Sequence, residues 1–501
     1  MPPRARAALE FVAWGTLFGL AFGQSPLYTS NQNQYFLHGL AQAGIGSLSE
    51  DWLANTADPT PLFTSLVTLT QRVLHPAFYY LYFLMLAGLY FLSLRRIAVR
   101  IFDFHQYPNA QWAFAALLFI AHSAALRFAL GRGIGGEWEY LFDGGVAGQR
   151  LLGDVLQPSA FGVLLLVSIQ QYLEGHPMRA IAASALAVAV HPTYLLSAGV
   201  LTVAYVFETS RGEGARRSAQ LAGLGFALTL PILIYLSRTF LPTSAEAQRI
   251  LVDFRIPAHA IPAVWFDAAV IVKLVGVGLA LYLTRGSKLA VVMGVSAAIG
   301  IGLTALQVTL ASDALALAFP WRISTYLVPL ATAILVGAAC GWIAKRVRVD
   351  LLRPLCALVV GLAVLSGAAS SAVQATARQA APERGAQTFV DASRMPGQVY
   401  LIPPKLQDFR LATGAPIVAD FKSIPYRGDE VLEWYARVRL LGFFYRDQVA
   451  EIDCGLLAEF AIEYGVTHVV LEPDQRGLAC AGLTQLYDDG QYAVFELELQ
   501  R

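Results

Sequence analysis

Long apolar runs recur along the chain and leave few folds open to it. A transmembrane helix rises about 1.5 Å per residue and needs roughly 20 apolar residues to cross a bilayer. Only 14% of the 501 residues are charged, against about 25% in soluble domains. Apolar runs of suitable length lie near residues 7–23, 77–94, 111–130, 159–173, 218–237, 265–284, 289–310, 320–343 and 351–372. The sequence therefore predicts a polytopic α-helical membrane protein.

One further apolar region, residues 180–206, has His191 and Pro192 at its centre. Positively charged loops favour the cytoplasmic side of a membrane. The basic clusters of the later loops share that side with Arg4 and Arg6 only if the chain turns back at His191. We therefore predict about eleven membrane-crossing segments, with the N-terminus inside and everything after about Ser371 outside.

The first 25 residues have a charged start and an apolar core, as a secretory signal does. The spans that follow need this segment as an uncleaved span that begins inside. We therefore predict a first membrane helix here. The domain organisation that results is a transmembrane domain over residues 1–375 and an extracytoplasmic domain over residues 381–501.

Net charge and cysteine content narrow the choice of partners and compartments. The net charge is +1, and the sequence shows no basic stripe of the kind that binds nucleic acid, so we exclude nucleic acid as a partner. The four cysteines fit no zinc-ligand spacing. Cys340 and Cys356 lie in apolar runs, whereas Cys454 and Cys480 lie near the C-terminus and can pair in an oxidising compartment.

The C-terminal segment has the composition of a soluble domain. Runs of β-branched and aromatic residues predict strands, and a recurrence of apolar residues at three and four predicts helices. The predicted strands are 398–402, 415–421, 467–471 and 492–499, and the predicted helices are 429–441 and 455–464. Strands that alternate with helices predict a small α/β domain with a partly parallel sheet.

A polar insert over residues 24–76, called here the first insert, carries the first acidic candidates. Glu50 fits a capping box with Ser47, and Asp58 fits the N-cap of an amphipathic helix that continues to Leu74. Both acids therefore have a structural alternative. Asp51 has no such local explanation. It lies beside Trp52, whose indole suits the membrane interface, although an exposed loop acid is the alternative.

Other polar side chains stand out against the apolar background. Asn33 and His38 belong to an amide-rich cluster at the outer end of the first span, which suits sugar hydroxyls but also ordinary loop packing. Ionisable groups at membrane depth are costly and serve as functional hypotheses, with snorkelling or packing as the alternative. The outward-facing candidates of this kind are Arg322, His191, Arg255 and His259.

This arrangement resembles the GT-C class of membrane glycosyltransferases, which use polyprenyl-linked sugars. The resemblance rests on the N-inside start, a large first outer loop with acidic residues and an amphipathic helix, many uneven spans and a C-terminal α/β domain. That class often places its acid directly after the first span, where this chain has Asn31–Gln34. The resemblance implies a polyprenyl-linked sugar donor and a glycan, lipid or protein acceptor.

The resemblance also implies roles for the candidates. Asp51 would be the catalytic base, and Glu50 or Asp58 would assist it or hold a divalent cation, although the cofactor itself is not readable. Arg322, with Arg255, would bind the lipid phosphate. The histidines His191 and His259, together with Asn33 and His38, would complete the substrate-binding set.

Two other functions compete with the enzyme. A non-catalytic membrane subunit would bury its spans against protein partners and dock a complex through its outer domain. A transporter would be expected to show an inverted repeat, and the sequence shows none. The excess of Arg over Lys and the Ala-rich and Gly-rich spans are compatible with a bacterial source. We therefore expect the inner membrane, with the N-terminus cytoplasmic and the C-terminal domain periplasmic.

Overall fold

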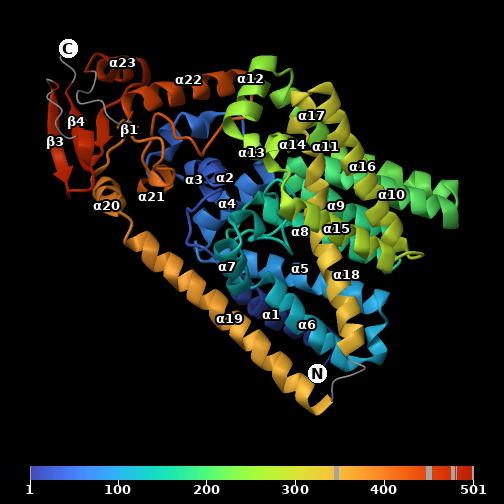
Figure 1. Cartoon of the computed structure of the whole chain (residues 1–501). Helices are drawn as coiled ribbons and strands as arrows, with labels where there is room; N and C mark the ends of the chain where they lie inside the picture. The colour runs from blue at the N-terminus through green and yellow to red at the C-terminus, as the bar shows by residue number, and fades with distance from the viewer. Residues whose placement is uncertain (1, 344–348, 447–453, 476–479, 481, 499–501) are drawn as a thin grey trace. The chain divides into compact units, whose positions relative to one another are not determined.

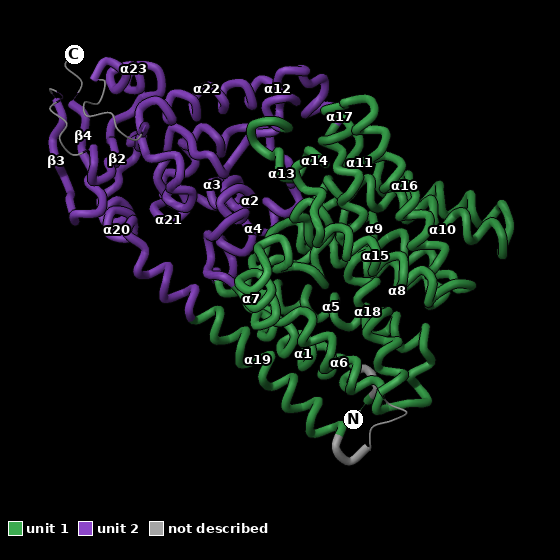
Figure 2. The backbone as a smooth tube through the Cα atoms, in the orientation of Figure 1, with its two compact units in different colours: residues 1–24, 77–236, 252–372 green, residues 25–76, 237–251, 373–501 purple. Residues whose placement is uncertain are grey.

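The computed structural model describes residues 2–343, 349–446, 454–475, 480 and 482–498, and it divides the chain into two compact units (Figures 1 and 2). Unit 1 holds residues 1–24, 77–236 and 252–372, and unit 2 holds residues 25–76, 237–251 and 373–501. Almost all of the first insert therefore belongs to the same unit as the C-terminal segment.

Unit 1 is helical. Its elements include most of the long helices α11 and α19, which continue into unit 2. The helices are α1 (Pro3–Phe22), α5 (Phe78–Ile101), α6 (Pro108–His122), α7 (Ala124–Gly133), α8 (Val163–Leu173), α9 (Pro177–Val190), α10 (Leu195–Gly212), α11 (Ala215–Phe240), α13 (Pro257–Ala260), α14 (Pro262–Trp265), α15 (Ala268–Leu283), α16 (Lys288–Leu310), α17 (Asp313–Leu317), α18 (Ser324–Ile343) and α19 (Val349–Gln379).

Among the described residues, six helices are long and apolar enough to cross a membrane, or up to seven if the bent pair α6–α7 is one span. Shorter apolar helices cover Pro158–Leu173, Pro177–Val190 and Ala268–Leu283. The predicted set of long apolar helices is therefore confirmed, and the membrane crossings and their number stay a prediction. Small residues bring helices α1 and α5 together, since a Cβ on Gly15 would lie 3.2 Å from the Cα of Gly88.

Unit 2 combines short helices with one sheet. Its helices are α2 (Gln32–Tyr35), α3 (Leu37–Ala43), α4 (Pro61–Val73), α12 (Ala245–Arg249), α20 (Arg384–Ser393), α21 (Phe409–Thr413), α22 (Gly428–Phe444) and α23 (Cys454–Tyr464). Its strands are β1 (Tyr400–Leu401), β2 (His468–Leu471), β3 (Leu483–Asp488) and β4 (Ala493–Leu497). Unit 2 also contains the short helical turns η1 (Leu48–Glu50), η2 (Leu53–Asn55) and η9 (Pro473–Gln475). The remaining short helical turns are η3 (Phe104–Gln106), η4 (Gly136–Trp138), η5 (Pro158–Gly162), η6 (Pro192–Tyr194), η7 (Ile250–Arg255) and η8 (Pro320–Ile323).

The sheet has the order β1-β2-β4-β3, with β1 parallel to β2 and the other pairs antiparallel. The predicted partly parallel sheet is confirmed. The predicted strand 415–421 is wrong, because it makes only an isolated bridge between Ile417 and Tyr400. Strand β3 was not predicted from its polar sequence LTQLYD, which fits an edge position with mostly exposed side chains.

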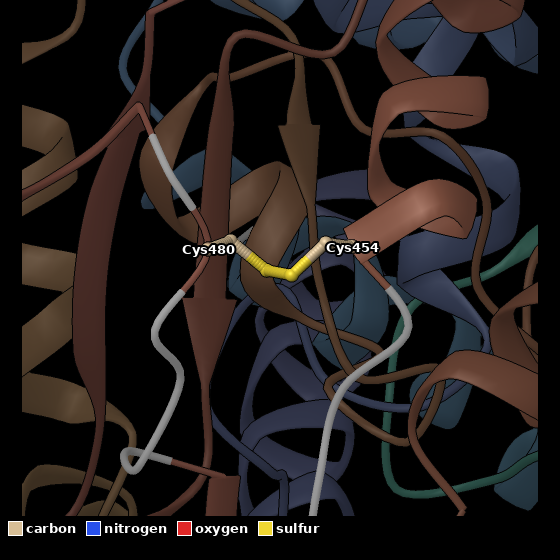
Figure 3. The surroundings of a disulfide bond; sticks show 2 residues. All are labelled: Cys454 and Cys480. Carbon is tan, nitrogen blue, oxygen red and sulfur yellow. A yellow bond between two sulfur atoms is a disulfide. The ribbon is translucent and has the colours of Figure 1, made fainter.

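A disulfide joins the two C-terminal cysteines (Figure 3). Cys454 begins helix α23, and Cys480 precedes strand β3, with their Cα atoms 5.6 Å apart. The bond ties the last helix of unit 2 to the segment that leads into the antiparallel hairpin. The structure therefore contains the disulfide between Cys454 and Cys480 that the sequence allows in an oxidising compartment.

Candidate functional site

Asp51 lies in the interior of unit 2. Its side chain has no exposed surface, and its Oδ1 accepts hydrogen bonds from the backbone N–H of Leu53 at 2.9 Å and Ala54 at 3.3 Å. Its Oδ2 accepts from Arg410 Nε at 2.9 Å and from the Ile417 N–H at 3.0 Å. Every lone-pair direction of this carboxylate has a donor, as is typical of a buried structural acid.

Arg410 connects Asp51 to a second buried acid. The guanidinium is 2% exposed and donates from Nη1 to Asp420 Oδ2 at 2.8 Å. Burial raises the pKa of Asp420, while Arg410 and the backbone N–H of Ser423 act in the opposite direction. The three side chains form an ion network between the first insert and the C-terminal segment. The sequence does not indicate that Arg410 pairs with Asp51, because 359 residues separate the two.

The other two acids of the first insert also accept hydrogen bonds from backbone N–H groups. Glu50 Oε2 accepts from the Gly397 N–H at 2.8 Å, and Asp58 Oδ1 accepts from the Thr60 N–H at 2.8 Å. The two caps that the sequence predicted are wrong in detail. Ser47 makes no side-chain cap, and helix α4 follows Thr60 rather than Asp58.

The amide and histidine candidates of the first insert are buried in unit 2. His38 Nε2 lies 3.2 Å from the Thr56 carbonyl oxygen, and Asn33 is 2% exposed. Glu430, which the sequence did not single out, accepts from the Ala57 N–H at 3.0 Å, and burial raises the pKa of this carboxyl. His38 and Glu430 therefore contact backbone groups of unit 2 as the acids do, whereas Asn33 Oδ1 has no hydrogen-bond partner among the described residues.

Arg322 and His191 meet in unit 1. Arg322 lies in the short turn η8, just before helix α18, and its Nη1 is 3.3 Å from His191 Nε2 and donates to Thr193 Oγ1. An imidazole Nε2 that carries no proton can accept a hydrogen bond from this guanidinium. The two candidates that the sequence placed in separate loops therefore form one polar cluster.

His259 and Arg255 lie in the segment that precedes helix α15. His259 Nδ1 is 2.6 Å from the Ala147 carbonyl oxygen, while Arg255 ends the π-helical turn η7 and is half-buried. An apolar cluster surrounds this segment and includes Val146, Trp265 and Trp321. The segment of Arg255 and His259 therefore packs against the loop of Val146 and the turn that contains Trp321.

Asp143 is a buried acid that the sequence offers only as a weaker candidate, together with the other acids of its loop. Its side chain is 3% exposed, and no described residue donates a hydrogen bond to either of its carboxylate oxygens. The nearest cation is Arg127, on helix α7, whose Nη1 lies 4.0 Å from Asp143 Oδ2 and also lacks a hydrogen-bond partner among the described residues. A buried carboxylate without donors costs free energy, and such groups collect at functional sites.

The loop that carries Asp143 is held against helix α18. Ser324, the first residue of that helix, accepts from the Val146 N–H at 2.8 Å, and Lys273 Nζ donates to the Gly145 carbonyl oxygen at 3.0 Å. Position 145 requires glycine, because a Cβ there would lie 2.4 Å from Ser324 Oγ. The loop of Asp143 and the turn of Arg322 therefore meet at the start of one helix.

This arrangement supplies a buried carboxylate that can accept a proton and a guanidinium that can bind a phosphate. Within the residues that the structure describes, no group of three or more His, Cys, Asp or Glu side chains is placed to hold a metal ion. No signal in the sequence separates Asp143 from its neighbours Glu137, Glu139 and Asp154.

Comparisons with known proteins give limited matches. Residues 381–441 match a family model described as "Domain of unknown function (DUF6798)". No curated protein matches the chain. Among solved structures, the chain is similar to ArnT from Cupriavidus metallidurans in the apo state, with 14% sequence identity over 99% of this chain and 98% of that chain and a TM-score of 0.43. We draw no functional conclusion from these two likenesses.

Proposed function

We propose that this protein is an integral membrane glycosyltransferase of the GT-C type, which transfers a sugar from a polyprenyl-linked donor to an acceptor on the extracytoplasmic side. The observation that carries the proposal is Asp143, a buried carboxylate to which no residue in the described part of the chain donates a hydrogen bond, on a loop hydrogen-bonded to the start of helix α18. Arg322 lies two residues before that helix start.

In this reaction the acceptor hydroxyl attacks the anomeric carbon, and the bond between that carbon and the phosphate oxygen breaks. Asp143 takes the hydroxyl proton as general base, and Arg127 orients the carboxylate. The phosphate leaves with the electron pair of the broken bond, and Arg322 stabilises its charge. His191 and Thr193 fix the guanidinium, which limits the reorganisation needed during the reaction.

The prediction that Asp51 is the base receives less support from its contacts. Its oxygens already accept four hydrogen bonds, all from unit 2. We therefore assign Asp51, with Glu50 and Asp58, to folding of the first insert. The disulfide supports an extracytoplasmic location for the C-terminal segment, because such bonds persist in oxidising compartments.

The test is transfer of labelled sugar by the purified protein from a panel of polyprenyl-phosphate donors. Asp143→Asn should lower the rate by about 10²–10⁴-fold, the range for removal of a general base, and Arg322→Ala should also impair transfer. Asp313→Asn is the matched control, since it changes an acid that begins the short helix α17. Full transfer by Asp143→Asn would overturn its role as base.

A non-catalytic membrane subunit is the second candidate. The structural bonds of all three first-insert acids favour it, because that insert is where the sequence predicted catalysis. This candidate predicts that the wild type transfers nothing from any donor and copurifies with a stoichiometric protein partner. Transfer that depends on Asp143 would exclude it.

A further inference from the structure

Unit 1 contains a polar cavity whose lining shares no residue with the site described above. Its volume is about 470 Å³, and helices α1 and α5 supply most of its walls. The polar side chains that line it are Glu10, Arg95, Arg96, Arg100, Asp103, His105, Gln111 and Glu174. The positive-inside pattern predicts that this end of the helices faces the cytoplasm.

Three arginines form the cationic side of the cavity. Arg95 is held in place, because its Nη2 donates to Gln111 Oε1 at 2.9 Å and its guanidinium lies 5.8 Å from the Trp14 ring centroid. Arg96 and Arg100 lie one helical turn apart on α5 and are exposed. Guanidinium groups in this arrangement suit a phosphate, which they can bind through two parallel hydrogen bonds.

Three carboxylates balance these cations. Glu10 Oε1 lies 3.2 Å from Arg6 Nε, Glu174 accepts from Gln170 Nε2 at 3.0 Å, and Asp103 accepts from Gln106 Nε2 at 2.5 Å. The three arginines and three acids of the lining give it a formal charge near zero when histidine is not counted. A lining with both signs matches a zwitterion better than an anion.

Apolar side chains continue from the cavity along the helices. Ala7, Leu92 and Val99 belong to its lining, and Trp14, four residues after Glu10 and on the same face of helix α1, has its ring centroid 5.8 Å from the Arg95 guanidinium. A head group in the cavity would therefore leave its acyl chains beside apolar helix surface. Basic pockets between helices on the cytoplasmic side are known to bind lipid head groups.

We propose that this cavity binds the phosphoethanolamine head group of a membrane lipid. Arg96 and Arg100 bind the phosphate, and Glu10 with Asp103 accepts hydrogen bonds from the ammonium group. A choline head group has no N–H to donate and binds less well. An anionic phosphatidylglycerol head group offers no ammonium to the carboxylates and also binds less well.

The experiment is native mass spectrometry of the full-length protein released from detergent, titrated with phosphatidylethanolamine, phosphatidylcholine or phosphatidylglycerol. We expect the phosphatidylethanolamine adduct to form at the lowest concentration. Replacing both Arg96 and Arg100 by Gln should weaken retention of phosphatidylethanolamine and phosphatidylglycerol about three- to tenfold, since each exposed charge pair contributes modestly. Arg216→Gln, an exposed arginine of helix α11 outside the cavity, should change neither.

Glu10→Gln distinguishes a zwitterionic from an anionic ligand. It should weaken retention of phosphatidylethanolamine and leave that of phosphatidylglycerol unchanged or stronger. Equal retention of the two lipids, with no effect of Glu10→Gln, would overturn the assignment to phosphoethanolamine. Retention unchanged by the double arginine variant would overturn the site itself.

Soluble glycerophosphoethanolamine separates a lipid from a free ligand. It should fail to displace the lipid at equal concentration, because it lacks the acyl chains. Displacement at equal concentration would show that the cavity takes a free phosphoethanolamine compound and would overturn the lipid assignment.

Discussion

Two buried acids, Asp51 in unit 2 and Asp143 in unit 1, have opposite surroundings. Asp51 accepts four hydrogen bonds, one of them from a buried guanidinium. Asp143 is just as hidden from solvent, yet no described residue donates to it, and its nearest cation is 4.0 Å away. Burial alone therefore does not distinguish these two acids, whereas the number of hydrogen-bond donors around each carboxylate does.

The difference follows from what each acid connects. Asp51 joins the first insert to Arg410 and Ile417, so its contacts stabilise the packing of segments that are distant in the chain. The loop of Asp143 is fixed by its backbone, through Gly145 and Val146. Its carboxylate is therefore positioned without using its own hydrogen-bonding capacity, which leaves that capacity for a substrate.

The largest expected loss of stability is that of Arg410→Met. This change leaves two buried carboxylates without their common cation, and breaking a buried ion pair costs about 3–5 kcal/mol. Denaturant unfolding of the full chain in detergent, followed by hydrogen exchange of peptides from residues 400–430, measures it. Lys405→Met, which breaks an exposed pair with Glu472, is the control and should cost about 1 kcal/mol or less. Equal losses for both variants would contradict the structural role of Arg410.

Removal of the disulfide should have the next largest effect. Cys454→Ser opens a link between residues 26 apart in sequence, and removal of such a bond costs about 2–4 kcal/mol. Thermal unfolding of unit 2 measures the loss. The double variant with Cys480→Ser should lose no more than the single one, because both lack the same bond. A further large loss in the double variant would indicate a separate role for Cys480.

Arg322→Lys tests the proposed site of unit 1, and its expected effect is smaller. Lysine keeps the charge but loses the planar fork, so the KM for the lipid-linked donor should rise about tenfold, equivalent to about 1.4 kcal/mol. Arg211→Lys, an exposed arginine near the Phe207 ring, should leave KM unchanged. An unchanged KM in Arg322→Lys would show that the guanidinium does not bind the phosphate.

The smallest effect concerns pH. His468 lies on β2 and stacks on Tyr400 with ring centroids 4.8 Å apart, and burial lowers the pKa of this imidazole although Glu496 opposes the shift. Between the lowered pKa and the ordinary value of about 6.5, the unfolded chain binds more protons. Stability of unit 2 should therefore be complete above that ordinary value and fall as the pH drops below it. Thermal unfolding against pH should show a weaker acid dependence for His468→Asn than for the wild type.

Local patterns in the sequence predicted much of the fold. Hydrophobic length predicted the helical part of unit 1, and periodicity predicted helices α22 and α23 and strands β1, β2 and β4. The segment 415–421 has the composition of a strand but is held as a loop, because Asp51 accepts from Ile417 and the chain bridges Tyr400 only once. A prediction from local composition cannot take into account a hydrogen-bond partner as distant in sequence as Asp51.

The candidate site was less accessible to sequence reasoning. The sequence singled out Arg322 and His191 separately, as polar groups in apolar surroundings, but their contact depends on the packing of segments 131 residues apart. Asp143 has the same sequence context as the other acids of its loop. Its distinguishing feature is a lack of donors, which is a property of the folded structure.

The most direct test is the stability of Asp51→Asn and Asp143→Asn, measured side by side by denaturant unfolding of the full chain in one detergent. Asp51→Asn should lower the free energy of unfolding by about 3 kcal/mol or more, because it leaves Arg410 with a weakened partner. Asp143→Asn should lower it clearly less, because the ion pair that it breaks, with Arg127 at 4.0 Å, contains no hydrogen bond among the described residues. A large loss in Asp143→Asn, with none in Asp51→Asn, would contradict the division into a structural and a chemical acid.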